Sequence, residues 1–133
     1  RRLMFVDASA LVAILLREPD RRMLLAALDP HARRFTSPLA IYETVAAIMR
    51  QRGFAKDGAE LRVARLLTAA NIVVVEITEE IGRAALDAFD RYGKGRGHPA
   101  QLNMGDCFSY AAARVLAVPL LYKGEDFATT ELG

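Results

Sequence analysis

The stretch LMFVDASALVAILL, residues Leu3 to Leu16, carries a single charged side chain, Asp7, between two apolar runs. Leu3–Val6 predicts a short buried strand, and Ala8–Arg17 predicts a helix that ends before Pro19. A carboxylate that leaves water without a partner costs several kcal/mol. We therefore expect Asp7 to lie at the carboxyl end of the first strand, where ligands reach an open parallel sheet.

The rest of the chain repeats this alternation of short apolar strands with helices. Further strands are predicted at residues 33–36, 72–77 and 119–122, and further helices at residues 20–28, 37–52, 57–70, 78–92 and 103–117. Asp20, Ser37 and Asn103 are the predicted N-caps, and Gly53 is the predicted end of the helix that Ser37 starts. Continuous apolar strands that alternate with helices predict an α/β fold with a parallel sheet.

The composition indicates one globular domain. The chain has 133 residues, of which 53% are hydrophobic and 26% charged, and residues 1–133 contain no linker, repeat or low-complexity segment. Its single cysteine, Cys107, excludes an internal disulfide and is typical of a reducing compartment such as the cytoplasm. No apolar run approaches the ~20 residues of a membrane-spanning helix. The net charge of +2 neither indicates nor excludes a nucleic-acid partner.

Three further acids share the apolar surroundings of Asp7. Glu43 lies in the run LAIYETVAAIM, and its neighbours three and four residues away are leucine and alanine rather than polar side chains. Asp106 lies near the start of an otherwise apolar helix, and Asp126 follows the last predicted strand. Glu125 directly precedes Asp126, so the sequence leaves open which of these two faces a site.

Together the four acids predict a metal site at one rim of the sheet. Clustered carboxylates repel one another and require a cation, and ligands that are all oxygen favour Mg²⁺ or Mn²⁺. Such an ion suits phosphodiester hydrolysis, because it activates water and neutralises phosphate charge. Two of the acids also have structural interpretations. Asp7 would serve as a helix N-cap, and Asp106 would interact favourably with a helix dipole.

Four segments together resemble the PIN domain and, within it, the VapC-type ribonuclease toxins of bacterial toxin–antitoxin pairs. The segments are MFVDASALVAIL, SPLAIYETVAAI, HPAQLNMGDCFSYAAA and PLLYKGEDF, and they extend over nearly the whole chain. The resemblance implies a three-layer α/β/α domain with a mostly parallel sheet of four to five strands. It also implies an RNA substrate, a homodimer and a cognate antitoxin, and the lack of a long apolar run predicts no membrane partner.

The same resemblance assigns roles to individual residues. It implies a Mg²⁺- or Mn²⁺-dependent endoribonuclease in which Asp7, Glu43 and Asp106 are catalytic and bind the metal, with Asp126 as the fourth catalytic and metal-binding acid. It also implies that the hydroxyl of Ser9, two residues after the first aspartate, forms a hydrogen bond within the site.

A glycine-rich loop, RYGKGRGHP at residues 91–99, leads directly into the helix that carries Asp106. Because the loop combines positive charge with this position, we expect Lys94 and Arg96 to contact RNA phosphates. The alternative is an ordinary solvated surface loop.

Two functions of other classes compete with the ribonuclease. A phospho-accepting receiver domain also places acids at the carboxyl rim of a parallel sheet, but it requires an aspartate after a central strand. The run IVVVEITEE offers Glu76 there, and a receiver leaves Glu43 unexplained. A catalytically silent interaction module is the third possibility, and the embedded acids disfavour it. Neither the RNA target nor the number of metal ions follows from the sequence.

Overall fold

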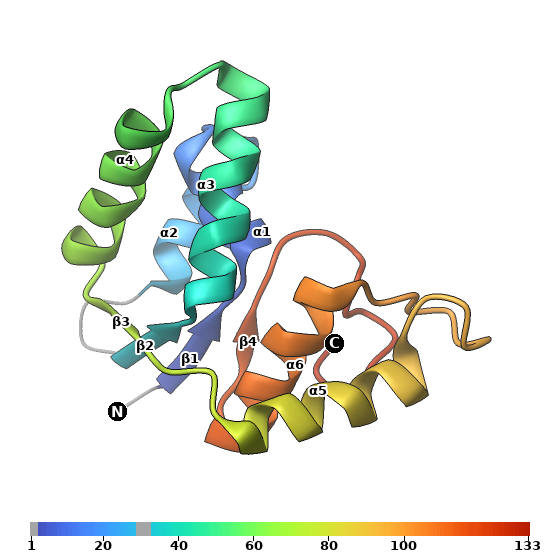
Figure 1. Ribbon diagram of the computed structural model, residues 1–133. Helices are drawn as coiled ribbons and strands as arrows, with labels where there is room; N and C mark the ends of the chain where they lie inside the picture. The colour runs from blue at the N-terminus through green and yellow to red at the C-terminus, as the bar shows by residue number, and fades with distance from the viewer. Residues whose placement is uncertain (1–2, 29–32) are drawn as a thin grey trace.

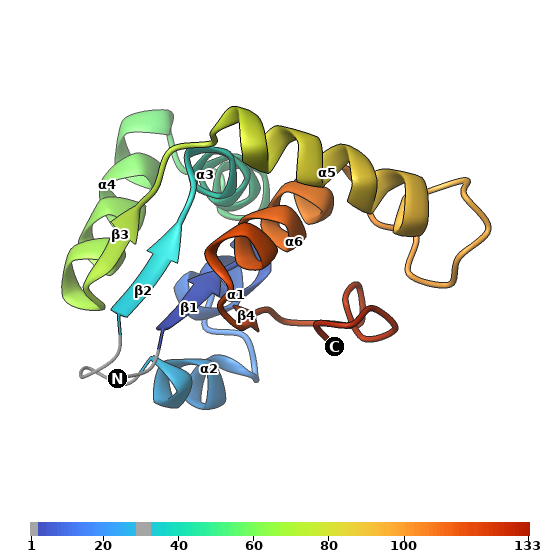
Figure 2. The ribbon, with the colours of Figure 1, turned by 90° about the horizontal axis from the view of Figure 1, so that it is seen from below.

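A computed structural model describes residues 3–28 and 33–133 of the chain. It consists of a four-stranded parallel sheet with helices packed on both faces (Figures 1 and 2). In chain order the elements are β1 (Leu3–Val6), α1 (Ala8–Leu15), α2 (Arg21–Ala27), β2 (Arg33–Thr36), α3 (Pro38–Arg52), α4 (Lys56–Ala69), β3 (Ile72–Val74), α5 (Glu79–Tyr92), α6 (Met104–Leu116) and β4 (Leu120–Leu121).

The strand order β3-β2-β1-β4 places β1 inside the sheet, between β2 and β4. Phe5 of β1 pairs with Phe35 on one side and with Leu120 on the other. All the pairs are parallel, so the carboxyl ends of the strands meet at one rim. The predicted α/β fold with a parallel sheet is confirmed, and the described residues contain four strands.

Alternate side chains of β1 enter different hydrophobic cores, as the pleat of a strand requires. Phe5 packs with apolar residues of α5 and α6 on one face of the sheet. Met4 and Val6 pack with apolar residues of α1 and α2 on the other face. The sheet is therefore the middle of three layers, which confirms the predicted α/β/α arrangement (Figure 2).

The helix that starts at Ser37 was predicted closely, because strong local signals mark both of its ends. The Ser37 hydroxyl accepts a hydrogen bond from the Ala40 N–H at 3.1 Å, and Pro38 is the first helical residue. Gly53 ends α3 with a φ of +68°, a left-handed conformation that glycine adopts without strain.

The first pair of helices differs from the prediction in one boundary and in one capping bond. Helix α1 ends at Leu15 rather than Arg17, which adopts a φ of 55° just beyond the helix. Asp20 is the N-cap residue of α2, as predicted, but its side chain makes no capping hydrogen bond, because its backbone is itself helical and does not aim the side chain at the first turn.

The valine-rich segment at 72–77 differs from the predicted buried strand. Only Ile72–Val74 is a strand, and it lies at the edge of the sheet. Val73 and Val74 are 43% and 45% exposed. β-branched residues favour any pleated surface, so their presence does not distinguish an edge strand from a central one. The other edge strand, Leu120–Leu121, is likewise shorter than predicted. In the described part of the chain no helix is long and apolar enough to cross a membrane.

Candidate active site

Asp7 lies where β1 ends and α1 begins, in the middle of the rim formed by the carboxyl ends of the strands. It is only 4% exposed. One carboxylate oxygen, Oδ2, accepts a hydrogen bond from the Ser9 N–H at 3.0 Å and so caps α1. The interpretation of Asp7 as a helix N-cap is therefore confirmed, and capping uses only one of its two carboxylate oxygens.

Glu43 reaches the rim from the second turn of α3, and a glycine of α6 makes room for it. A Cβ atom at Gly105 would overlap both oxygens of the Glu43 carboxylate. Because Gly105 has no side chain, the Glu43 carboxylate lies against the first turn of α6. Gly105 directly precedes Asp106 in the sequence. Gly105 was not among the site residues predicted from the sequence. The available signal was a glycine inside a helix, where alanine is more favourable unless close packing excludes it.

Asp106 lies in the first turn of α6 and is 8% exposed. It forms a reciprocal pair with Asn103: the Asn103 N–H donates to Asp106 Oδ2 at 3.1 Å, and the Asp106 N–H donates to Asn103 Oδ1 at 2.8 Å. This capping box fixes the orientation of the Asp106 carboxylate. The sequence predicted Asn103 as a cap but did not reveal its bond to this acid.

Burial raises the pKa of the Glu43 carboxyl to about 7, and the negative charge of Asp7 contributes to the shift. Burial also raises the pKa of Asp106 to about 7, against the lowering effect of the Asn103 N–H. The charges of Asp126 and Asp7 raise the pKa of Asp106 further. The four acids predicted from the sequence therefore lie close enough to act on one another electrostatically.

Leaving Arg34 aside, no lysine or arginine of the described residues forms an ion pair with any of these four acids. Asp7 and Asp106 are buried, Glu43 is half-buried and Asp126 is exposed. Carboxylates that gather in this way are a donor set that suits a hard divalent cation. However, within residues 3–28 and 33–133 no three acidic, histidine or cysteine side chains are already arranged to hold one ion. Ligation by three carboxylates would thus require their side chains to move together.

The segment after β4 brings the fourth acid to the rim. Ser9 Oγ accepts a hydrogen bond from the Lys123 N–H at 3.0 Å, which ties this segment to the start of α1. Asp126, rather than its neighbour Glu125, is the acid whose charge acts on Asp106. The Lys123 side chain forms an ion pair with Glu18 at 3.1 Å. Ser9 is therefore well placed to position the Asp126 segment.

The loop with Lys94 and Arg96 extends beyond the end of α5 (Figure 1). Arg96 forms an ion pair with Asp90 at 2.9 Å. Lys94 lines an apolar pocket between α5 and α6. Neither contact involves the four acids, and the interaction of this loop with RNA stays a prediction.

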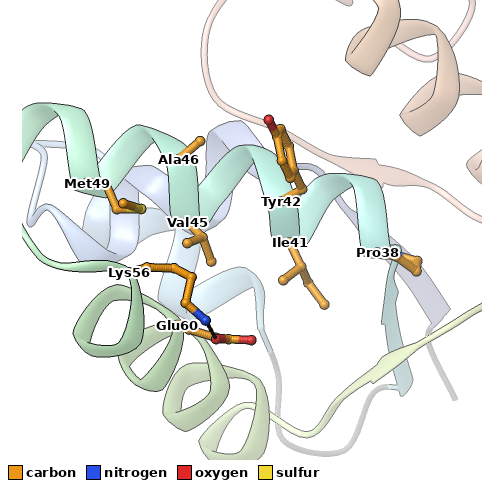
Figure 3. Close-up of a pocket in the computed structure, with 8 residues that line it drawn as sticks. All are labelled: Pro38, Ile41, Tyr42, Val45, Ala46, Met49, Lys56 and Glu60. Carbon is orange, nitrogen blue, oxygen red and sulfur yellow. Dashed lines mark hydrogen bonds and ion pairs between the residues drawn. The ribbon is translucent and has the colours of Figure 1, made fainter.

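A separate pocket of about 410 Å³ lies between α3 and α4 (Figure 3). Its lining is mostly apolar, with the ion pair between Lys56 and Glu60, at 3.3 Å, on one side. Ile41 and Val45 line it from α3, whereas Glu43 lies between them in sequence and so on another face of the helix. This pocket is therefore distinct from the acidic rim.

Comparisons with known proteins show which family and fold this chain resembles. Residues 4–132 match the PIN domain. A VapC ribonuclease of Rhizobium meliloti is 44% identical, over 97% of this chain and 99% of that protein. Two solved structures share the fold. The Mycobacterium tuberculosis toxin VapC20, described as cleaving the sarcin-ricin loop, has a TM-score of 0.74 at 19% identity and covers 96% of this chain and 95% of its own. A toxin–antitoxin complex from Klebsiella pneumoniae has a TM-score of 0.69 at 17% identity, with coverages of 96% and 92%.

Proposed function

Because the chain belongs to the PIN-domain family and, within it, to the VapC ribonucleases, we propose that it is a Mg²⁺- or Mn²⁺-dependent endoribonuclease. We propose further that it acts as the toxin of a toxin–antitoxin pair. One observation carries the proposal: Asp7, Glu43, Asp106 and Asp126 share a rim where their charges act on one another. A receiver domain or a silent interaction module leaves that arrangement without a purpose.

In this proposal Asp7, Glu43 and Asp106 hold the ion, and Asp126 completes the acidic pocket. When bound, the ion supplies positive charge for the scissile phosphate and makes water a better nucleophile at neutral pH. Asn103 holds the Asp106 carboxylate in place, and Gly105 admits the Glu43 carboxylate. Ser9 holds the segment that carries Asp126.

The partners in this proposal are an RNA substrate, a cognate antitoxin and a second copy of the chain, in the cytoplasm. The likeness to a solved toxin–antitoxin complex supports the antitoxin. Leu86, Phe89 and Met104 support the homodimer, because these large apolar side chains are exposed beside one pocket of α5 and α6. The buried free thiol of Cys107 suits a reducing compartment.

The test is cleavage of a structured RNA pool by the wild type and by Asp7→Asn, with Mg²⁺, with Mn²⁺ and with EDTA. Asparagine caps a helix as well as aspartate does, so this substitution removes a metal ligand and keeps α1 intact. We expect ion-dependent cuts from the wild type and none from the variant. Glu125→Gln, which removes an exposed acid next to the site, is the matched control and should cleave normally. Full activity of Asp7→Asn, or cleavage in EDTA, would overturn the proposal.

A further inference from the structure

A second charged site lies where α1 and α3 end, at the end of these helices that is remote from the sheet (Figure 1). It is a pocket of about 490 Å³. We call it the arginine pocket, after the residues that line it: Arg17, Arg21, Arg52, Arg62 and Arg65, with Ile14, Leu15, Phe54 and Leu66. None of the four acids of the rim contributes to it.

Three of these arginines are held in place by neutral partners. Arg21 Nε donates to the Ile14 carbonyl at 2.9 Å, and an Arg52 guanidinium nitrogen donates to the Leu16 carbonyl at 2.9 Å. The Arg62 guanidinium lies over the Phe54 ring, 3.9 Å from its centroid. These contacts orient the guanidinium groups without neutralising them. Side chains that are already ordered lose less entropy when a ligand binds.

No arginine of the pocket forms an ion pair with a carboxylate of the described residues. Basic side chains elsewhere do form such pairs, among them Arg83 with Glu79 and Arg114 with Glu131. Like charges gathered around one pocket repel one another. The arginine pocket is thus a concentration of positive charge that an anionic ligand would stabilise.

We propose that the arginine pocket binds phosphates of the RNA substrate away from the bond that is cleaved. Guanidinium groups match the geometry of phosphate oxygens. The aromatic ring of Phe54 among the arginines adds a surface of the kind on which single-stranded bases stack. This inference rests on the proposed ribonuclease function and adds to it a second surface for the substrate.

The distance between the two sites suits one RNA molecule. Helix α1 separates Asp7 from Arg17, and its 8 residues correspond to roughly 12 Å at the rise of a helix. A short length of RNA spans that distance. The acidic rim repels phosphates until an ion binds there, so a remote basic surface would retain the substrate meanwhile.

Arg17 and Arg65 are the best positions for a test, because both are exposed and neither makes a side-chain hydrogen bond within the described residues. We would combine Arg17→Gln and Arg65→Gln in the Asp7→Asn background, which should not cleave. The matched control, Lys56→Gln with Arg83→Gln, removes the same charge from residues that already have acidic partners. Thermal unfolding of each variant verifies that it folds.

The measurement is fluorescence anisotropy of a labelled 20-mer of uridine at several salt concentrations. Two lost phosphate contacts should lower the slope of log Kd against log salt by about 1.4, which is about 25-fold in Kd at 0.1 M salt. The control variant should keep the slope of its parent. Arg17→Lys with Arg65→Lys should retain most of the slope, because the charge remains.

An unchanged slope in the pocket variant would overturn the inference, and so would a parent that binds no RNA. If the pocket variant lost binding to poly-glutamate but bound RNA as its parent does, the inference would also be overturned. The ligand would then be an acidic protein segment. Cleavage by the wild type is scored separately. If the wild type does not cleave RNA but the pocket variant has a lowered slope, the proposed enzyme is rejected and the RNA-binding surface is kept. If the wild type cleaves RNA but the pocket variant has an unchanged slope, the enzyme is kept and the RNA-binding surface is rejected.

Discussion

The acidic rim and the arginine pocket hold charges of opposite sign in different ways. Asp7 at the end of β1 and Asp106 in the first turn of α6 are buried, whereas Glu43 in the second turn of α3 is half-buried and Asp126 after β4 is exposed. The pKa values of Glu43 and Asp106 are raised to about 7. The arginines are mostly exposed, and carbonyl oxygens and an aromatic ring orient them. The rim stores unfavourable electrostatic energy, which one small cation would relieve. The pocket presents its charge to water, where an extended anion can reach it.

This contrast indicates that tertiary packing matters more to the acids than to the arginines. The rim depends on the packing of α3 against α6. Gly105 of α6 is the residue against which the Glu43 carboxylate of α3 packs. The arginine pocket depends on long flexible side chains, which tolerate small changes in the backbone. Substitutions that disturb packing should therefore impair the rim first.

The largest effect is expected for Gly105→Ala. Its methyl group overlaps the Glu43 carboxylate and would displace it, and a misplacement of about 1 Å costs roughly 100-fold in rate. RNA cleavage under saturating Mg²⁺ measures the loss. Gly82→Ala is the matched control, because a Cβ at this position in α5 meets nothing within 4 Å. It should cleave normally. Equal activity of the two variants would show that the Glu43 position is unimportant.

Ion binding should produce the next largest effect. Mg²⁺ at 100 times its Kd stabilises the folded protein by about 2.7 kcal/mol, provided that it does not bind the unfolded chain. The midpoint of thermal unfolding should therefore rise by several degrees in the wild type and much less in Asp7→Asn. Potassium chloride at the same ionic strength controls for general screening. An equal rise in both proteins would place the ion elsewhere.

Much of the rim was predictable because its acids contradict their surroundings. Asp7 and Glu43 were found as charged residues in apolar runs, and the parallel fold then brought them to one rim. Gly105 was not predictable in this way, because its role depends on contact between two helices far apart in sequence. The bond of Asn103 to Asp106 was visible in principle, because a cap at Asn103 makes Asp106 the third helical residue, the position that completes a capping box.

The fold shows the same division between local and tertiary causes. The boundaries of α3 follow from a serine and proline at one end and a glycine at the other, and these act within a few residues. The edge position of β3 follows from the order of the strands, which valine-rich composition does not encode. Arg34 is a further example of a tertiary cause. Its charged side chain is buried in β2 and donates a hydrogen bond to the carbonyl of Ala70, just before the adjacent strand β3.

Without an ion, protonation of Glu43 and Asp106 should stabilise the folded protein. The pKa values of Glu43 and Asp106 are about 7 in the folded state and ordinarily 4.5 and 3.8. Between these limits the folded state binds more protons, so the free energy of unfolding falls as the pH rises from about 4 to 7. Thermal unfolding in EDTA at several pH values measures this. Glu43→Gln should flatten the profile, and Glu125→Gln should not. Water screens the half-buried Glu43, so we expect a smaller change than the ion produces.

The smallest effect is expected for Asn103→Ala. This change removes the acceptor for the Asp106 N–H and should destabilise the fold by about 1 kcal/mol, the usual value of an N-cap. The backbone N–H of residue 103 still reaches Asp106, so cleavage should fall only slightly. Asn103→Ser restores a capping oxygen and should recover the stability measured by urea unfolding. The contrary outcome has two parts: Asn103→Ala loses most of its cleavage, and Asn103→Ser recovers the stability but not the cleavage. That outcome would mean that the Asn103 amide itself contacts RNA.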